Sequence, residues 1–599
     1  MNPTETFQSR KNSYQNLADQ FQKQYNQWAM FRAILFLVIA AISYFTYQFL
    51  SGNYTIIVVL IGIALFLFSV NKHLKIKYLR DKNRVLSILN ENEIKRLSNV
   101  FTRAETGEQF AEMNHFYASD LDIFGKQSLF KLLNRTHTYT GGAVLANWLK
   151  YPVTRIEILQ RQEAIEELVA KIDFRQDLEA SAMLIEEVSE PTNKLISWNE
   201  LPENETIKKP IFQYGKYLPY FTISLILAWA FNFIPIGYPL LMLVIHGFIL
   251  KQIYEIVSNA IDQTLRLSGT LKAYANLSEL IVNEHFTHNK LQNLKSELQE
   301  ASPAIRALED ILNKLGNRAN PIFALVMGLP LLWDIQYFIK LENWKKQHRQ
   351  SLPKWLLAIA EIETLNSLAG LQFANPNFIK PDISEALITL KAKGLGHPMI
   401  RANKRITNDI QLLGEGKTII ITGSNMSGKS TFQRTVAVNM VLALAGSVVC
   451  AEAFACSCVR VFTSMRTQDS LEEDTSSFYA ELKRLKQLIT SVNTEQSADN
   501  DFPVFYFLDE ILKGTNSKDR HEGAKALMLQ LHRTTASGFI STHDVELGDE
   551  FDNQGFVENY NFSSEVVNND LVFDYKLRSG VCHSFNASLL MKGIGIEMG

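Results

Sequence analysis

The stretch TIIITGSNMSGKSTFQRTVAV, residues 418–438, contains the pattern that decides the fold of this 599-residue chain. A β-branched apolar run leads into Gly423, and Gly428-Lys429-Ser430 then opens a segment with helical spacing. The match is to G-x-x-x-x-G-K-[ST], in which glycines let successive backbone N–H groups turn inward around phosphates. The sequence therefore predicts a strand, a phosphate-binding loop, and a helix whose N-terminus faces a nucleotide.

Each residue of this loop has an expected task. Lys429 would reach the β- and γ-phosphates of ATP, and the Ser430 hydroxyl would bind Mg²⁺. Backbone N–H groups of the rest would surround the phosphates. The candidate nucleotide-binding residues are Gly423, Ser424, Asn425, Met426, Ser427, Gly428, Lys429, Ser430 and Thr431.

Two later apolar runs end in residues that suit the same site. FPVFYFLDE (502–510) ends in Asp509 and Glu510, and ASGFIST (536–542) is followed by His543. Parallel strands deliver such side chains to one edge of a sheet. Asp509 would hold Mg²⁺ through water, Glu510 would orient or deprotonate the attacking water, and His543 would touch the γ-phosphate. Either feature alone is usually a polar strand end, but their order after the phosphate loop favours catalysis.

The pattern of apolar and polar residues changes at about residue 391. From there to residue 599, short β-branched runs alternate with helical stretches, which is typical of a parallel sheet covered by helices. Upstream, residues 81–115 and 251–315 show apolar residues at three- and four-residue spacing, which predicts long amphipathic helices within a mainly α-helical region, 81–390. The expected fold is thus multidomain, with helices first and an α/β P-loop domain last.

Residues 1–80 contain two uncharged apolar runs, 33–50 and 54–70. Each is about long enough to cross a hydrocarbon core of about 30 Å, and Ser51-Gly52-Asn53 between them predicts a hairpin turn. Basic residues flank the pair on both sides, and the turn has none. By the positive-inside rule both ends face the cytoplasm. The flanking residues are Arg10, Lys11, Lys23 and Arg32 before the pair and Lys72, Lys75, Lys77 and Arg80 after it.

A second pair, 217–234 and 236–250, predicts another membrane hairpin with cytoplasmic ends. Its second arm is short and contains Pro239 and His246, so a buried helical hairpin is the alternative. A further apolar run, 321–339, contains two prolines and Asp334, which favours a place in the protein core.

Overall composition leaves the partner open. Sixty Lys and Arg against 62 Asp and Glu give a net charge of −2, so no global basic character indicates nucleic acid. The first apolar run follows a polar stretch and lacks a cleavage pattern, so no cleavable signal peptide is expected. The four cysteines are too sparse for a disulfide framework, and Cys456 and Cys458 are at best half of a metal site.

Several motifs resemble the MutS family of DNA mismatch-repair ATPases. They are TGSNMSGKST, FYFLDEILKGTNS and ISTHD, with GHPMI at 396–400, VFTSMRTQDSLEEDTSSFYAEL at 461–482, and the 572–590 segment. Residues 121–168 resemble the start of the family's helical core. Leu512-Lys513-Gly514-Thr515 departs from the family's usual Gly-Arg-Gly-Thr.

The resemblance implies an ABC-like ATPase fold and a homodimer with composite ATP–Mg²⁺ sites. Ser476, in the family's signature segment, would reach the γ-phosphate across the interface. The family's mismatch-reading domain is expected to be absent and replaced by the membrane hairpin, and a helical dimerisation tail is expected to be absent too.

Two functions compete at this point. The first is a dimeric ATP-driven switch, tethered to lipid as a multi-pass cytoplasmic-membrane protein with its ATPase domain in the cytoplasm, that binds mismatched, branched or damaged DNA. The alternative is a membrane-anchored switch that acts on a protein or membrane partner without DNA. An ABC transporter is a weaker third, because Leu267-Ser268-Gly269 lies before the phosphate loop and the hairpins make a poor translocation path.

Overall fold

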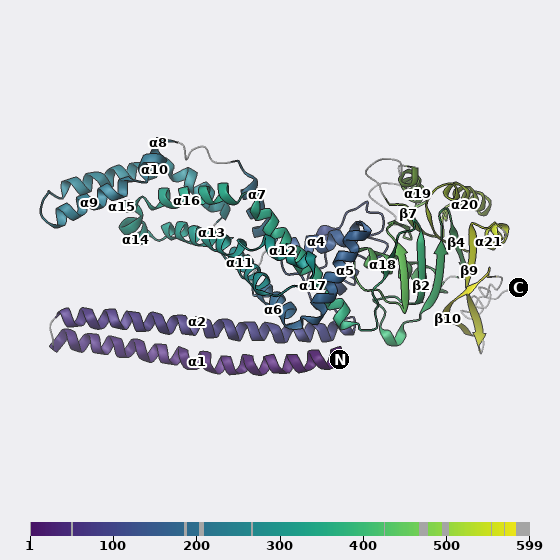
Figure 1. Ribbon diagram of the computed structural model, residues 1–599, viewed down its shortest axis with the longest axis horizontal. Helices are drawn as coiled ribbons and strands as arrows, with labels where there is room; N and C mark the ends of the chain where they lie inside the picture. Colours follow the sequence, from purple (N-terminus) through teal and green to yellow (C-terminus); the bar gives the residue numbers. More distant parts are fainter. Residues whose placement is uncertain are drawn as a thin grey trace.

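The molecule is elongated, with helices toward one end and two β-sheets at the other (Figure 1). The computed structural model describes residues 2–49, 52–184, 189–202, 209–264, 267–424, 426–466, 477–493, 502–552, 554–567 and 570–582. The statements below refer to these residues.

A long helical hairpin begins the described chain, as predicted. α1 (Pro3–Phe49) and α2 (Gly52–Leu97) have 47 and 46 residues and lie antiparallel along one side of the molecule (Figure 1). Their polar halves pack together: the Arg80 guanidinium lies 4.4 Å from the Tyr25 ring centroid, and Ser87 Oγ donates to Lys11 O at 3.2 Å. Their apolar halves, toward the turn, expose most of their side chains. The hairpin is therefore an apolar tip on a polar stalk, and α2 continues beyond residue 80.

The helical body adjoins this stalk. Its centre is α17 (Ser351–Ala374), which buries most of its residues and contacts α4 and α5. The other helices of the body are η1 (Glu108–Phe110), α3 (Leu129–Leu133), α4 (Tyr139–Lys150), α5 (Arg155–Ala170), α6 (Ile172–Met183), α7 (Ser189–Glu200), α11 (Ser268–Asn283), α12 (Asn289–Glu297), α13 (Ala301–Gly316), η4 (Asn317–Ala319) and α16 (Trp333–His348).

An arm projects from this body toward the same end as the hairpin tip (Figure 1). Its outer elements are α8 (Pro210–Gly215), α9 (Leu218–Ala230), α10 (Gly237–Thr264), α14 (Pro321–Phe323), the π-helical η5 (Ala324–Gly328) and α15 (Leu329–Leu331). His246 ties three of them together: its Nε2 lies 3.1 Å from Thr222 Oγ1 and its Nδ1 lies 2.9 Å from Leu329 O. α9 and α10 thus form a hairpin that is fixed at its base, while many of its apolar side chains are exposed, among them Leu227 at 52% and Val244 at 70%.

The prediction that 321–339 belongs to the core is wrong for its first part. The side chains of Ile322 and Leu325 are 75% and 68% exposed, whereas Ile335 and Phe338 of α16 are fully buried. The chain bends between α15 and α16, where Leu332 adopts a left-handed backbone with φ 46°. The apolar side chains of 321–331 are thus exposed on the arm and do not belong to the core.

Three helices are long and apolar enough to cross a membrane: Pro3–Phe49, Gly52–Leu97 and Gly237–Ala260. The pair Pro321–Leu331 and Trp333–His348, bent by 78°, would add a fourth if it is one span. α9 has 13 residues, fewer than the roughly 20 of a full span.

Two sheets form the other end. The larger has the order β10-β9-β4-β8-β7-β6, in which all neighbours are parallel except β9 and β10. The smaller has the order β1-β5-β2-β3. The strands are β1 (Asp382–Ser384), β2 (Thr389–Leu395), β3 (Asn408–Leu413), β4 (Thr418–Gly423), β5 (Ala453–Ser457), β6 (Arg460–Ser464), β7 (Val504–Asp509), β8 (Ser537–Thr542), β9 (Val557–Val567) and β10 (Asp570–Ser579).

Five further helical segments belong to this end: η6 (Ala402–Lys404), α18 (Lys429–Leu444), α19 (Ser477–Asn493), α20 (Ser517–His532) and α21 (Val545–Phe551). α18 contacts β4, β6, β7 and β8 as well as α4 of the helical body. The predicted parallel α/β domain is confirmed, and its phosphate-loop helix also touches the helical body directly.

Candidate nucleotide-binding site

The predicted phosphate loop joins β4 to α18. β4 is fully buried between β8 and β9, so its last residue, Gly423, is fixed at the carboxyl edge of the sheet. Gly423 and Gly428 have φ 149° and 106°, a backbone region that favours glycine. A Cβ at Gly423 would lie 2.6 Å from Phe562 O, and one at Gly428 would lie 3.0 Å from the Tyr575 ring. Both glycines are required by the local geometry.

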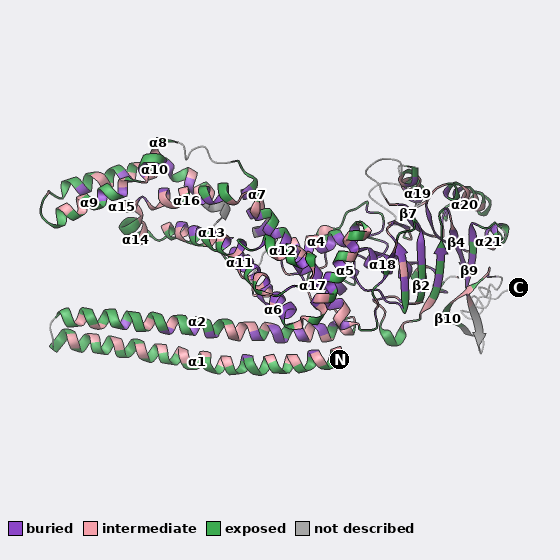
Figure 2. Ribbon diagram, in the orientation of Figure 1, coloured by how far each residue is buried: buried purple, intermediate pink, exposed green. Residues whose placement is uncertain are grey.

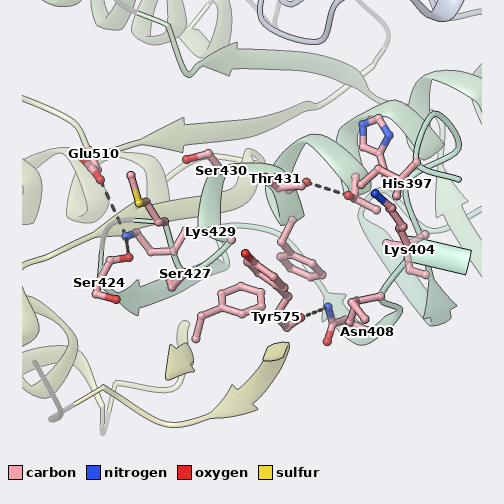
Figure 3. A pocket seen from close by; sticks show the side chains of 18 residues that line it. His397, Lys404, Asn408, Ser424, Ser427, Lys429, Ser430, Thr431, Glu510 and Tyr575 are labelled. Carbon is pink, nitrogen blue, oxygen red and sulfur yellow. Dashed lines mark hydrogen bonds and ion pairs between the residues drawn. The ribbon is translucent and has the colours of Figure 1, made fainter. Parts of the chain in front are cut away.

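A cavity of about 400 Å³ opens over this loop (Figure 3). Its phosphate side is formed by Ser424, Met426, Ser427, Gly428, Lys429, Ser430 and Thr431. Its other side is formed by residues from 395 to 408 together with the Phe562 and Tyr575 rings. The cavity has one wall rich in N–H and hydroxyl donors and another with aromatic and apolar groups, which suits a nucleotide's phosphates and base.

Lys429 lies inside this cavity wall. Its Nζ donates to Gly423 O at 2.8 Å and Ser424 O at 3.0 Å, and it lies 3.9 Å from Glu510 Oε1 (Figure 3). Burial lowers the pKa of Lys429, while the nearby Glu510 carboxylate opposes that effect. Ser424 Oγ and Ser427 Oγ are buried without a hydrogen-bond partner among the described residues. Unpaired hydroxyls beside a buried cation fit a phosphate ligand.

Strands β7 and β8 bring the predicted acidic pair and histidine together. Asp509 pairs with Ser541 in the sheet register and accepts a hydrogen bond from its hydroxyl. Glu510 follows in a left-handed conformation, φ 50°, and its N–H donates to Ser541 O at 3.0 Å. Its Oε1 lies 2.6 Å from His543 Nε2. The three residues, predicted from separate stretches, therefore share one edge of the sheet.

The Glu510 carboxylate lies between the His543 ring and two lysines. His543 lies closest, Lys513 Nζ is 2.9 Å from Oε2, and Lys429 Nζ is 3.9 Å from Oε1. The hydrogen bond from His543 is the main reason that the pKa of Glu510 falls to about 2, with Lys513 also lowering it and burial opposing both. The carboxylate is ionised at neutral pH and is a weak base, which favours holding a water in place over taking its proton.

The residues assigned to Mg²⁺ have suitable chemistry. Ser430 lies in the first turn of α18, where it lines the cavity, and Asp509 ends the adjacent strand β7. A hydroxyl and a carboxylate are the hard oxygen donors that Mg²⁺ prefers beside substrate phosphates. When bound, the ion would neutralise charge that develops on those phosphates.

One functional candidate escaped prediction: Glu481 of α19. Its carboxylate accepts the backbone N–H groups of Leu512 and of Lys513, the latter at 3.2 Å. Leu512 is itself left-handed, with φ 61°, so Glu481 holds a strained loop directly after Glu510. Burial raises the pKa of Glu481. Its place in SSFYAEL, inside the quoted family-like segment, was the only available signal.

A second missed feature is the contact between β3 and β10. Asn408 Nδ2 donates to Tyr575 O at 3.0 Å, and its Oδ1 accepts from Leu577 N at 2.8 Å (Figure 3). Tyr575 has φ 54° within an irregular part of β10. Asn408 therefore holds the Tyr575 ring over Gly428. Asn425 and Ser476, both predicted nucleotide contacts, lie outside the described residues.

Comparison with known proteins gives a consistent picture. The family model for MutS domain V matches residues 419–589, and that for MutS domain III matches residues 114–500. The DNA mismatch repair protein MutS of Clostridium botulinum strain Loch Maree is 25% identical over 505 residues, covering 77% of this chain and 53% of the relative. The protein of the same name from Thermotoga petrophila is 26% identical over 485 residues, covering 76% and 60%. The chain thus spans little more than half the length of these relatives.

Proposed function

The chain belongs to the MutS family and is an ATPase, and on this premise we propose that it is a membrane-tethered switch. In this proposal the ATP cycle moves the helical body, and the hairpin tip and the end of the arm contact lipid. Its ATP would be bound with Mg²⁺ in the cavity over Gly423 to Thr431.

The distribution of exposed apolar side chains carries the proposal. In Figure 2 the hairpin tip and the end of the arm are mostly exposed, and both lie at the end of the molecule opposite the sheets. Leu37 on α1 is 66% exposed, and Phe233, beyond α9, is 81% exposed. Contiguous apolar surfaces on this scale mark membrane or protein contacts. A single bilayer at that end would cover both.

Basic and aromatic residues lie where such a bilayer would meet water. Arg32 and Lys72 flank the hairpin's apolar halves, and Lys216 and Lys251 flank those of the arm. Tyr217, Tyr220 and Trp229 are exposed on the arm, and such side chains favour the membrane interface. With positive charge inside, the ATPase end would face the cytoplasm of a multi-pass protein in the cytoplasmic membrane.

In the proposed reaction, Lys429 leaves its loop carbonyls to bind the β- and γ-phosphates, and Ser430 and Asp509 hold Mg²⁺. Glu510, fixed by His543 and Lys513, orients the attacking water, and His543 meets the γ-phosphate. Because α18 contacts both the sheet and α4, a change at the phosphates would reach the helical body through one rigid element.

We propose that two copies of the chain form the working unit, as in the family. Ser476 of one copy would then complete the ATP site of the other. This dimer rests on family membership, since a single chain is described.

DNA binding is the second candidate, and family membership favours it. Both relatives named above carry the name DNA mismatch repair protein. Against it, the arm ends in uncharged apolar residues, which offer little to a phosphate backbone. The exposed surface of the arm therefore favours a membrane switch that acts without DNA.

Two measurements test the tether and the binding of DNA separately. Alkaline carbonate extraction should leave the full chain in the membrane pellet, and release into the supernatant would reject the tether. Detergent-solubilised chain should not bind homoduplex, mismatched or branched DNA at low salt, where electrostatic affinity is strongest. Binding, or a DNA-dependent change in ATP turnover, would instead support the second candidate.

A further inference from the structure

A second cavity, of about 280 Å³, lies where the hairpin stalk meets the ATPase end. Four arginines line it: Arg96 at the end of α2, Arg135 after α3, and Arg401 and Arg405 in the segment that leads to β3. None of the described residues that line it is Asp or Glu. This arginine cavity is separate from the nucleotide cavity, with which it shares no lining residue.

The inner two arginines are held rigidly. Arg96 Nη1 donates to Lys131 O at 2.8 Å and to Leu132 O at 2.7 Å, and Arg135 Nη1 donates to Leu133 O at 2.8 Å. Both guanidiniums share a single carboxylate, Glu93, at 3.3 Å and 2.7 Å. Among the described residues, Glu93 is the only carboxylate within ion-pair distance of these two guanidiniums, and Glu179 attracts both at longer range.

The outer two arginines add further positive charge. Arg401 Nε donates to Ser98 O at 3.1 Å, and Arg405 Nη2 donates to Ile400 O at 2.7 Å. In the described part of the chain, neither forms an ion pair with a carboxylate. Burial, with Arg135 adding to it, lowers the pKa of Arg96 to about 10, so its charge remains at neutral pH. Four arginines thus line the cavity, and Glu93, which is not a lining residue, pairs with two of them.

Size and surroundings indicate the ligand. The volume is close to the lower end of small-molecule pockets, which begin at about 300 Å³. Apolar groups such as Phe378 and Leu371 form part of the wall beside the guanidiniums. Thr4, in the first turn of α1, also lines the cavity, so the positive end of a long helix dipole adds to the field.

We propose that the arginine cavity is an effector site for a soluble phosphorylated small molecule, held through its phosphate groups by Arg96, Arg135, Arg401 and Arg405. Guanidiniums bind phosphate oxygens in pairs and in fixed geometry. A lipid headgroup does not fit the position. Thr4 precedes the apolar run by about 28 residues of continuous helix, or about 42 Å at 1.5 Å per residue.

The segment 398–405 connects this site to ATP. Ile400 and Lys404 line the nucleotide cavity, whereas Arg401 and Arg405 line the arginine cavity. The same segment is bound to the hairpin, because Asn99 Nδ2 donates to Met399 O at 2.8 Å. A ligand that draws the arginines together would move the 398–405 segment relative to a nucleotide in the other cavity. Occupancy of one cavity therefore changes affinity at the other, and the coupling is reciprocal.

Inorganic pyrophosphate is a suitable probe. Its binding to the full chain is measured by calorimetry in phosphatidylcholine nanodiscs, in a Lys429→Ala background that removes the main cation of the phosphate loop. Arg401→Ala in that background should weaken binding about tenfold or more, because one charge-assisted contact is lost. Arg401 is exposed and makes one hydrogen bond, so folding should survive its loss. Arg533→Ala, an exposed arginine outside both cavities, is the matched control and should bind as its parent does.

Coupling is measured with Lys429 intact. Pyrophosphate competes with ATP at the phosphate loop in the parent chain and in Arg401→Ala. Pyrophosphate should therefore change the ATP turnover of the two chains to different extents, and an equal response of both chains would contradict the coupling. Equal pyrophosphate affinity in the Arg401→Ala and parental chains, or no binding at all, overturns the site. Loss of binding when phosphatidylglycerol is added to the nanodiscs would assign the cavity to lipid headgroups and overturn the soluble ligand.

Discussion

Replacing Glu510 by glutamine tests the assignment of the water-positioning residue. The substitution preserves the size of the side chain and removes its charge. At neutral pH that charge is fully present, because the pKa of Glu510 is about 2. A unit charge pair at the 3.9 Å between Lys429 Nζ and Glu510 Oε1 interacts by about 4 kcal/mol at an effective dielectric constant of about 20. Glu510→Gln removes this attraction.

Two opposite effects should follow. Hydrolysis should fall by at least about 100-fold, because a neutral amide holds the attacking water less well than a carboxylate. ATP affinity should stay the same or rise, because Lys429 is no longer drawn to Glu510 and the phosphates no longer face a carboxylate. Single-turnover hydrolysis and equilibrium ATP binding measure the two effects separately. Glu522→Gln, an exposed glutamate on α20, is the matched control.

Hydrolysis within about threefold of the parent chain would refute the assignment, since such a change is too small for the loss of a transition-state contact. A parallel loss of ATP binding would also refute the assignment, because Glu510 would then contribute to binding ATP itself and not to the hydrolysis step.

Substitutions at three further residues test neighbouring parts of the ATPase end. His543→Gln removes the main cause of the low pKa of Glu510, so the acid limb of ATP turnover should move to higher pH than in the parent chain; an unmoved limb would contradict that link. Glu481→Ala should cost about 1–3 kcal/mol and lower both the thermal midpoint and turnover, because the backbone N–H groups of Leu512 and Lys513 lose their acceptor. Glu481→Gln should retain part of both. His521 has its pKa raised above 6.5, chiefly by its hydrogen bond to Asp544, so its stabilising effect is complete below pH 6.5 and is lost as pH rises through the raised pKa. The thermal midpoint of His521→Gln should therefore trail the parent most at low pH, and a gap that widens with pH would be inconsistent with this ion pair.

The local parts of the site could be predicted from sequence. The phosphate loop is a contiguous pattern, and Asp509, Glu510 and His543 each follow an apolar strand whose parallel neighbours are easily inferred. Contacts between distant segments could not be predicted. Glu481 accepts a hydrogen bond from Leu512 N because the fold brings α19 against the loop after β7. No spacing in the sequence predicts that these two segments are in contact.

The helical half shows a similar limit. Apolar runs marked both hairpins, but the polar stalk of α1 and α2 depends on pairing between residues as far apart as Lys11 and Ser87. Prolines and Asp334 made 321–339 look like core, yet the bend at Leu332 separates an exposed part from a buried one. Burial is a property of the assembled arm, which composition alone does not reveal.

Site-directed thiol labelling tests whether the hairpin tip and the end of the arm enter one bilayer. Asn53→Cys and Asn232→Cys place exposed thiols at the two tips, far from the sheets. In sealed vesicles whose orientation is known, a membrane-impermeant maleimide should modify neither thiol from the ATPase side beyond the labelling of the parent chain, and detergent should expose both. Ready labelling of Asn53→Cys and Asn232→Cys from the ATPase side without detergent would contradict the account.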